Sequence, residues 1–284
     1  MSPTEAIQKV ARELLAGGQV SCVIGYEVGP RGRARPAFIY QPEDVGRLVW
    51  NQQCTHNLTV YLRHKLRPGG GQAPQPVAVV VKPCDSRAIN VLLAENQIAR
   101  QQVYLIGLAC PGIRQGAADD APLQARCLRC DMRTPVVYDV LIGEPAPSQP
   151  AQPDAELERL AAMTPAERMD FWLSQFDRCI RCYACRQACP LCNCPTCLYE
   201  RDDSLWVGMG IRLGEKRAFH LGRAYHLAGR CIGCDECERV CPMNIPISLL
   251  NRALAREVEA AFGYRPGLEA QPSPITTMLS GEER

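Results

Sequence analysis

Two cysteine-rich segments of the same form lie in the second half of the chain. Each has three cysteines at two-residue gaps and a fourth cysteine, after a three-residue gap, that precedes a proline. The first segment runs from Cys179 to Pro190 and the second from Cys231 to Pro242. This is the ligand spacing of bacterial two-cluster ferredoxins, in which thiolates fill the outward valences of the irons. Two copies in one chain therefore predict two 4Fe–4S clusters.

The fourth cysteine of each segment is expected to bind the opposite cluster, as in two-cluster ferredoxins. One predicted ligand set is Cys179, Cys182, Cys185 and Cys241. The other predicted set is Cys231, Cys234, Cys237 and Cys189. Pro190 and Pro242 fit the start of a helix, where a missing N–H costs nothing. The competing interpretation is a pair of zinc sites, but zinc sites use paired cysteines rather than triples at equal spacing.

Length and composition bound the possible classes of protein. The chain has 284 residues, 17 cysteines and a formal net charge of +2. This length suits about two domains, and the small charge gives no support for a nucleic-acid partner. Residues 1–10 lack the features of a secretory signal, and no apolar run approaches the ~20 residues of a transmembrane segment. Abundant cysteine without export predicts metal ligation in the cytoplasm.

The first half has the pattern of an α/β domain with a mostly parallel sheet. Residues 77–81 and 103–108 are apolar runs without alternation, which is typical of strands buried on both faces. Further strands are expected at 20–28, 37–40 and 136–142. Capping boxes that begin at Ser2 and Thr164 predict helices. Other helices are expected at 43–50, 58–66, from Asp85 or Ser86 to 95, at 215–228 and at 247–262.

These elements predict two domains joined by a linker. The α/β domain is expected to span residues 1–143. Residues 144–155 are rich in proline and polar residues and predict a linker. A mainly helical, ferredoxin-like domain with two clusters is expected at 156–266. Residues 267–284 form a tail that is expected to be extended or docked on a partner.

Four more cysteines occupy suggestive places in the first half. Cys84 and Cys110 each follow a predicted parallel strand, and Cys127 and Cys130 form a pair in the loop beyond. Because the carboxyl ends of parallel strands share one rim, these thiols would meet there. The spacing alone leaves two interpretations open. The four thiols either form a third metal site or are two buried core cysteines and a separate loop pair.

Parts of the sequence resemble the beta subunits of coenzyme F420-reducing hydrogenases and F420-type formate dehydrogenases. Residues 79–88, residues 106–112 and the 127–130 pair resemble the core of these subunits, and residues 179–190 resemble their ferredoxin part. In that family the beta subunit carries iron–sulfur clusters, usually with FAD, and passes electrons within a larger complex. Several relatives work with heterodisulfide-reductase-like flavoproteins. The resemblance implies a third 4Fe–4S cluster on Cys84, Cys110, Cys127 and Cys130.

This chain departs from the family pattern in two respects. Many members have the ferredoxin part before the core, whereas here it follows. No G-x-G-x-x-G follows a predicted strand, so no dinucleotide fingerprint supports FAD. Lys82 and Arg87 flank a predicted helix start, where they would receive a flavin phosphate as cofactor-binding residues. The same cations would alternatively offset the charge of a cluster or be solvated.

The remaining cysteines and the histidines are expected to have ordinary roles. Cys192, Cys194 and Cys197 are interpreted as free thiols. One of them would alternatively replace Cys189 as the crossing ligand, or they would form another site with Cys54. The four histidines are expected to be packed or surface residues, since none has metal-ligand spacing.

The main functional hypothesis is an iron–sulfur electron-transfer subunit of a multi-subunit oxidoreductase. The complex would be a hydrogenase, a formate dehydrogenase or a heterodisulfide-reductase-like assembly, and single electrons would pass through two or three clusters. A second hypothesis is a subunit that contains FAD and exchanges a hydride with a deazaflavin or nicotinamide. A third is a zinc module that binds protein or nucleic acid.

Overall fold

The computed structural model describes residues 1–66, 75–116, 118, 120–203 and 206–277. The chain divides into two compact units. The first comprises Met1–Gln152 and Gly267–Gln271, and the second comprises Pro153–Pro266 and the residues that follow Gln271. Residues 278–284 of the predicted tail lie outside the described residues.

The first unit is built on a sheet with the strand order β2-β1-β3-β4-β5. The strands are β1 (Cys22–Val28), β2 (Ala34–Ile39), β3 (Val77–Val81), β4 (Val103–Leu108) and β5 (Val140–Ile142). β1, β3, β4 and β5 pair in parallel, and β2 joins one edge antiparallel to β1. The mostly parallel sheet predicted from the sequence is therefore confirmed.

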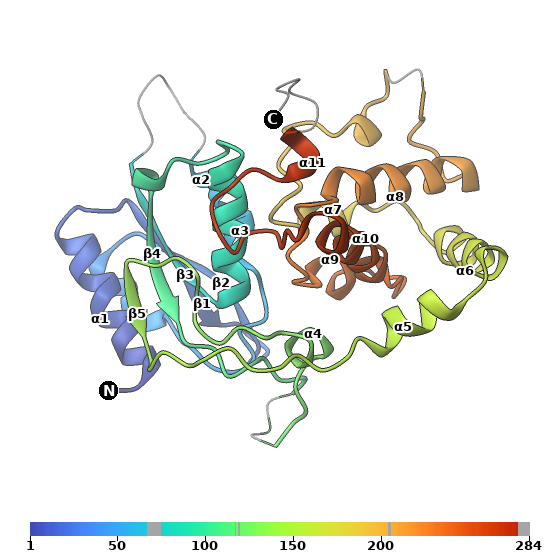
Figure 1. The fold of residues 1–284 in the computed structure, drawn as a ribbon. Helices are drawn as coiled ribbons and strands as arrows, with labels where there is room; N and C mark the ends of the chain where they lie inside the picture. Colours follow the sequence, from blue (N-terminus) through green and yellow to red (C-terminus); the bar gives the residue numbers. More distant parts are fainter. Residues whose placement is uncertain (67–74, 117, 119, 204–205, 278–284) are drawn as a thin grey trace. The chain divides into compact units, whose positions relative to one another are not determined.

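Helices cover this sheet because its central strands have no polar face. Every residue of β3 is buried, and Figure 1 shows α1 (Pro3–Ala16) and α3 (Pro83–Ala94) to either side of the strands. α3 also provides the crossover from β3 to β4, which parallel neighbours require. The shorter helices of this unit, with η for a 3-10 helix, are η1 (Pro42–Arg47), η2 (Leu58–Tyr61), α2 (Leu62–Lys65), η3 (Arg100–Gln102) and α4 (Ala125–Leu128).

Three expected elements differ from those in the structure. α3 begins at Pro83, and the Asp85 carboxylate accepts the N–H of Lys82 at 3.0 Å, so Asp85 lies inside the first turn and does not precede it. The strand expected at 136–142 is reduced to β5. Its start is displaced because the Asp139 carboxylate accepts the Leu105 N–H at 2.7 Å, in place of a backbone partner. The helix expected at 43–50 is only the short η1.

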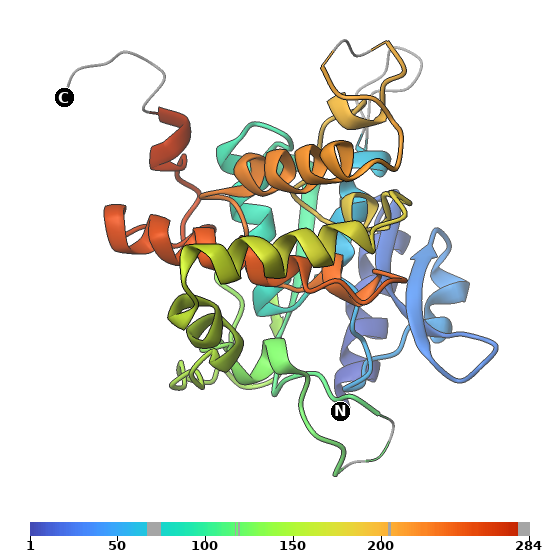
Figure 2. The ribbon, with the colours of Figure 1, turned by 90° about the vertical axis from the view of Figure 1, so that its right-hand side faces the viewer.

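The second unit is helical, as predicted. Its elements are α5 (Ala155–Ala162), α6 (Pro165–Asp177), α7 (Ala184–Gln187), η4 (Leu198–Glu200), α8 (Leu213–Leu227), α9 (Glu236–Arg239), α10 (Ile247–Phe262) and α11 (Pro274–Thr277). α6 begins at the predicted capping box of Thr164. Figure 2 shows α6 and α10 running alongside α8, and both helices contact it. Within the described ranges, no helix combines the length and apolarity needed to cross a bilayer.

Candidate functional site

The two cysteine segments fold into loops with the same backbone conformation. In the first loop Arg181 (φ 51°) and Tyr183 (φ 58°) adopt the left-handed conformation, and Gly233 (φ 69°) and Asp235 (φ 52°) do so at the equivalent places in the second. This conformation is uncommon for residues other than glycine. It directs backbone N–H groups inward, and the N–H of Arg181 donates to Cys179 Sγ at 3.3 Å. Both loops are therefore shaped to surround sulfur ligands.

A one-turn helix follows each loop and carries its third cysteine, Cys185 in α7 and Cys237 in α9. Pro190 and Pro242 then lie in turns, so the helix starts predicted at these prolines are wrong. The N–H of Asn244 donates to the Cys241 carbonyl at 3.1 Å, and this turn reverses the chain before α10 can begin.

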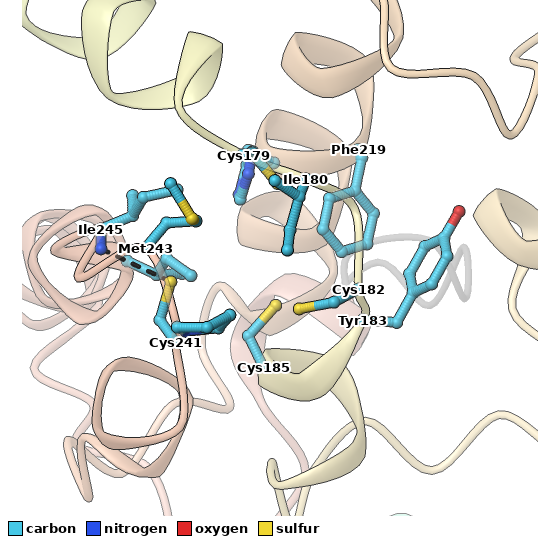
Figure 3. A pocket seen from close by; sticks show the side chains of 12 residues that line it. Cys179, Ile180, Cys182, Tyr183, Cys185, Phe219, Cys241, Met243 and Ile245 are labelled. Atoms are coloured by element: carbon cyan, nitrogen blue, oxygen red, sulfur yellow. Dashed lines mark hydrogen bonds between the residues drawn. The ribbon is translucent and has the colours of Figure 1, made fainter.

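Four thiols line one small cavity in the second unit. They belong to Cys179, Cys182, Cys185 and Cys241, which combine three cysteines of the first segment with the last cysteine of the second. Figure 3 shows Cys241 facing Cys182 and Cys185 from the opposite side of this cavity. Apolar side chains such as Phe219 complete the wall. Residues distant in sequence thus supply one sulfur-rich site.

The remaining cysteines of the two segments form a second group. Burial raises the pKa of Cys231 to about 11 and holds the pKa values of Cys234 and Cys237 well above the ordinary thiol value. The negative charge of Cys189 raises the pKa of all three further, because Cys189 lies beside them. The Cys189 sulfur accepts a hydrogen bond from Cys192, which lowers the pKa of Cys189 to about 5.

A third group of thiols lies in the first unit, at the carboxyl ends of β3 and β4. Cys84 is in the first turn of α3, and Cys110 follows β4. Cys127 is in α4, where its sulfur accepts the N–H of Ile113 at 3.2 Å, and Cys130 follows that helix. Burial raises the pKa of Cys110 to about 11, and the neighbouring charges of Cys127 and Cys130 raise it further. The neighbouring charge of Cys110 likewise raises the pKa of Cys84.

All three groups offer thiols, the kind of donor that iron–sulfur clusters use, and the group of Cys179, Cys182, Cys185 and Cys241 also surrounds a cavity. Thiolates are ligands for both zinc and 4Fe–4S clusters. In the described part of the chain, no three His, Cys, Asp or Glu side chains converge on a point that suits a single metal ion. In a cluster each thiolate binds its own iron, so the ligands surround a volume and need not meet. Four thiols around a cavity suit this geometry.

Lys82 is buried among internal partners. Its side chain is 2% exposed, and its ammonium lies 2.9 Å from Asp85 Oδ2. It also donates to the His56 carbonyl at 2.7 Å and to the Tyr26 hydroxyl. The flavin-phosphate contact considered for Lys82 does not fit this burial. The alternative role, offsetting thiolate charge, agrees with the action of Lys82 on the pKa of Cys84. Arg87 lies further along α3 and is half-buried.

The surplus cysteines differ in exposure. Cys194 is exposed, whereas Cys192 and Cys197 are half-buried. Cys54, considered as their partner in a further site, belongs to the first unit, where it is buried and its sulfur accepts the N–H of Asn51 at 3.4 Å. Its burial raises its pKa to about 11.

His220 is the one histidine that lines the cavity of the first cysteine segment, as far as the described residues show. Its ring stacks on Phe176 with centroids 4.8 Å apart, and burial lowers its pKa to about 4. Neither ring nitrogen has a hydrogen-bond partner among the described residues. No spacing in the sequence distinguishes this histidine, since only the packing of α8 brings it to the cysteines.

Comparisons with known proteins cover most of this chain. A family described as a 4Fe-4S dicluster domain matches residues 175–245. The F420-dependent formate dehydrogenase subunit beta of Methanocaldococcus jannaschii is 23% identical over 72% of this chain and 76% of that protein. The F420-dependent formate dehydrogenase 1 subunit beta of Methanococcus maripaludis is 25% identical over 70% of this chain and 74% of that protein. The resemblance expected from the motifs is therefore confirmed. The chain is thus similar to F420-dependent formate dehydrogenase beta subunits over about 70% of its length, and residues 175–245 match a 4Fe-4S dicluster domain.

Proposed function

We propose that this chain is the electron-transfer subunit of a multi-subunit oxidoreductase and that it conducts single electrons. The observation that carries the proposal is the cavity lined by thiols from both cysteine segments. A 4Fe–4S cluster, when bound, takes up and releases one electron at a time. The protein's part is to hold the thiolates, exclude water and direct N–H groups toward sulfur, which together set the reduction potential.

Three ligand sets follow from the three groups of thiols. The first is Cys179, Cys182, Cys185 and Cys241, the second is Cys231, Cys234, Cys237 and Cys189, and the third is Cys84, Cys110, Cys127 and Cys130. The third set rests on the shared rim of β3 and β4 and on the mutual charge effects of its thiols. The buried Lys82 offsets part of the negative charge at this rim.

The partner complex is proposed to be of the formate dehydrogenase type, because both named relatives are beta subunits of such enzymes. A hydrogenase or heterodisulfide-reductase-like complex would use the same relay with a different catalytic subunit. Exposed and half-buried thiols need a reducing compartment, which favours the cytoplasm.

Isolation of the tagged chain from its native host, without air, tests this proposal. We expect redox subunits to co-purify and the electron donor of the complex to generate the electron paramagnetic resonance (EPR) signals of reduced clusters. A chain that purifies with iron but is never reduced by its complex would contradict the electron-transfer role. Flavin fluorescence after denaturation tests the alternative of an FAD-containing subunit.

A cysteine variant tests the third site separately. Cys84→Ala is expected to lower the iron content by about four atoms per chain while the spectrum of the dicluster domain stays intact. Cys194→Ala is the matched control, because this exposed thiol belongs to none of the three sets. Equal iron in the two variants would remove the third site and leave the other two.

A further inference from the structure

Arg223 lies on the inner face of α8, between the two thiol groups of the dicluster domain. It is 4% exposed. One guanidinium nitrogen, Nη2, donates to the carbonyl of Cys185 at 3.1 Å, and the side chain also donates to the sulfur of Cys192. The positive charge acts on Cys185 of the first set and on Cys189 and Cys237 of the second. One buried cation is therefore adjacent to both sites.

The surroundings of Arg223 contain thiols where a carboxylate would be expected. A buried cation is costly unless an opposite charge compensates it. Among the described residues, no carboxylate forms an ion pair with Arg223, and its Nε has no hydrogen-bond partner. By contrast, the nearby Arg186 is paired with Glu200 at 3.0 Å. Thiolates bound to clusters would supply the missing negative charge.

We infer that Arg223 is a shared electrostatic positioning residue, which stabilises the reduced form of both clusters and raises both reduction potentials. The inference rests on the proposed function and deepens it. Each reduction adds one electron to a site that is already negative, so a fixed cation nearby favours the reduced form. Arginine keeps its charge in proteins, so this effect persists across the working pH range.

Cys192 connects Arg223 to Cys189 through two hydrogen bonds. Its sulfur accepts from Arg223, and its thiol donates to Cys189. Cys192 thus connects the cation to a ligand of the second set without being assigned as a ligand itself. Because the guanidinium bonds to the carbonyl of Cys185, a ligand of the first set, and to Cys192, the neighbour of a ligand of the second, its charge stays between the two sites.

A redox titration of the reconstituted full chain, monitored by EPR spectroscopy without air, tests the inference. Arg223→Met keeps the length of the side chain and removes the charge. We expect the equilibrium constant for reduction of each cluster to fall on the order of tenfold, which is about 59 mV for one electron. Arg217→Met is the matched control, because Arg217 is exposed on the same helix and its charge is screened by water. Arg223→Lys retains the charge and is expected to keep both potentials close to those of the unchanged protein.

The outcomes separate this inference from the proposed function. Unchanged potentials in an Arg223→Met protein with full iron content would overturn the inference alone. A fall in one potential only would overturn the shared role. If Arg223→Met fails to hold iron, Arg223→Lys decides the question. Retained clusters in the lysine variant would support the role of the charge. Lost clusters would show that the shape of the guanidinium matters, and would refute the electrostatic role. Absence of iron in the unchanged protein would instead refute the proposed function.

Discussion

The ion pair of Lys82 and Asp85 yields a quantitative prediction for the first unit. Substitution of Lys82 by Met removes an ammonium that lies 2.9 Å from a carboxylate whose side chain is 0% exposed. Burial lowers the pKa of Lys82, but the charge of Asp85 and the hydrogen bond with Tyr26 outweigh burial and hold the pKa well above its usual value. Lys82 is therefore charged at neutral pH, and the substitution leaves the buried Asp85 side chain without this counter-charge.

The expected cost follows from the burial of the pair. Removal of one partner from a buried ion pair lowers the free energy of unfolding by about 3–5 kcal/mol. This cost includes the loss of the hydrogen bond from Lys82 to the His56 carbonyl. Lys82→Met/Asp85→Asn removes both charges, so the double variant should be less destabilised than Lys82→Met alone. Lys9→Met, on the exposed face of α1, should change the free energy by less than about 0.5 kcal/mol.

Urea unfolding followed by tryptophan fluorescence measures this effect. Of the three tryptophans, Trp50 belongs to the first unit, where its ring lies 6.0 Å from that of Tyr26. A background with Trp172 and Trp206 replaced by Phe makes Trp50 the reporter. If Lys82→Met lowered the free energy of unfolding by less than about 1 kcal/mol, the buried ion pair would be refuted, because exposed ion pairs contribute up to about this amount.

Three further predictions concern the dicluster domain and the sheet. Cys241→Ser should remove about four iron atoms per chain and leave the other clusters in the EPR spectrum, whereas full iron content would exclude Cys241 as a ligand. Gly222→Ala places a Cβ inside the radius of the Tyr199 hydroxyl and should cost about 1–3 kcal/mol of unfolding free energy, and an unchanged urea midpoint would contradict this packing. Burial raises the pKa of Glu27, but its hydrogen bond and ion pair with Arg47 outweigh burial and lower it. The destabilisation by Glu27→Gln should therefore be complete above the ordinary glutamate pKa and shrink as the pH falls below it, and a pH-independent difference in unfolding free energy would argue against the pair.

Local signals in the sequence predict much of the fold. Ser2 and Thr164 cap helices that begin where their capping boxes indicate. The unbroken apolar run of β3 predicts burial on both faces, and the sheet has this burial. In these segments the determining interactions lie within a few residues of each other, so a single stretch of sequence contains them.

Other features depend on contacts between distant residues. The strand expected from Val136 begins only at Val140, because Asp139 bonds to Leu105 across the sheet. Tyr183 takes a left-handed conformation that its residue type does not favour. Arg223 shows no motif, and only the packing of α8 against both cysteine loops reveals its place. The spacing of the cysteines thus predicts the cluster chemistry. Side chains that would adjust the properties of the clusters, such as Arg223, can be identified only from the folded structure.

The central claim is that grouped thiols hold iron and sulfide so that the chain conducts electrons. Iron and acid-labile sulfide, quantified in the unmodified chain purified without air, test it most directly. We predict about 12 iron atoms and as many sulfides per chain, or about 8 if only the dicluster domain is occupied. A colourless protein with neither iron nor sulfide, or one with stoichiometric zinc in their place, would contradict the account.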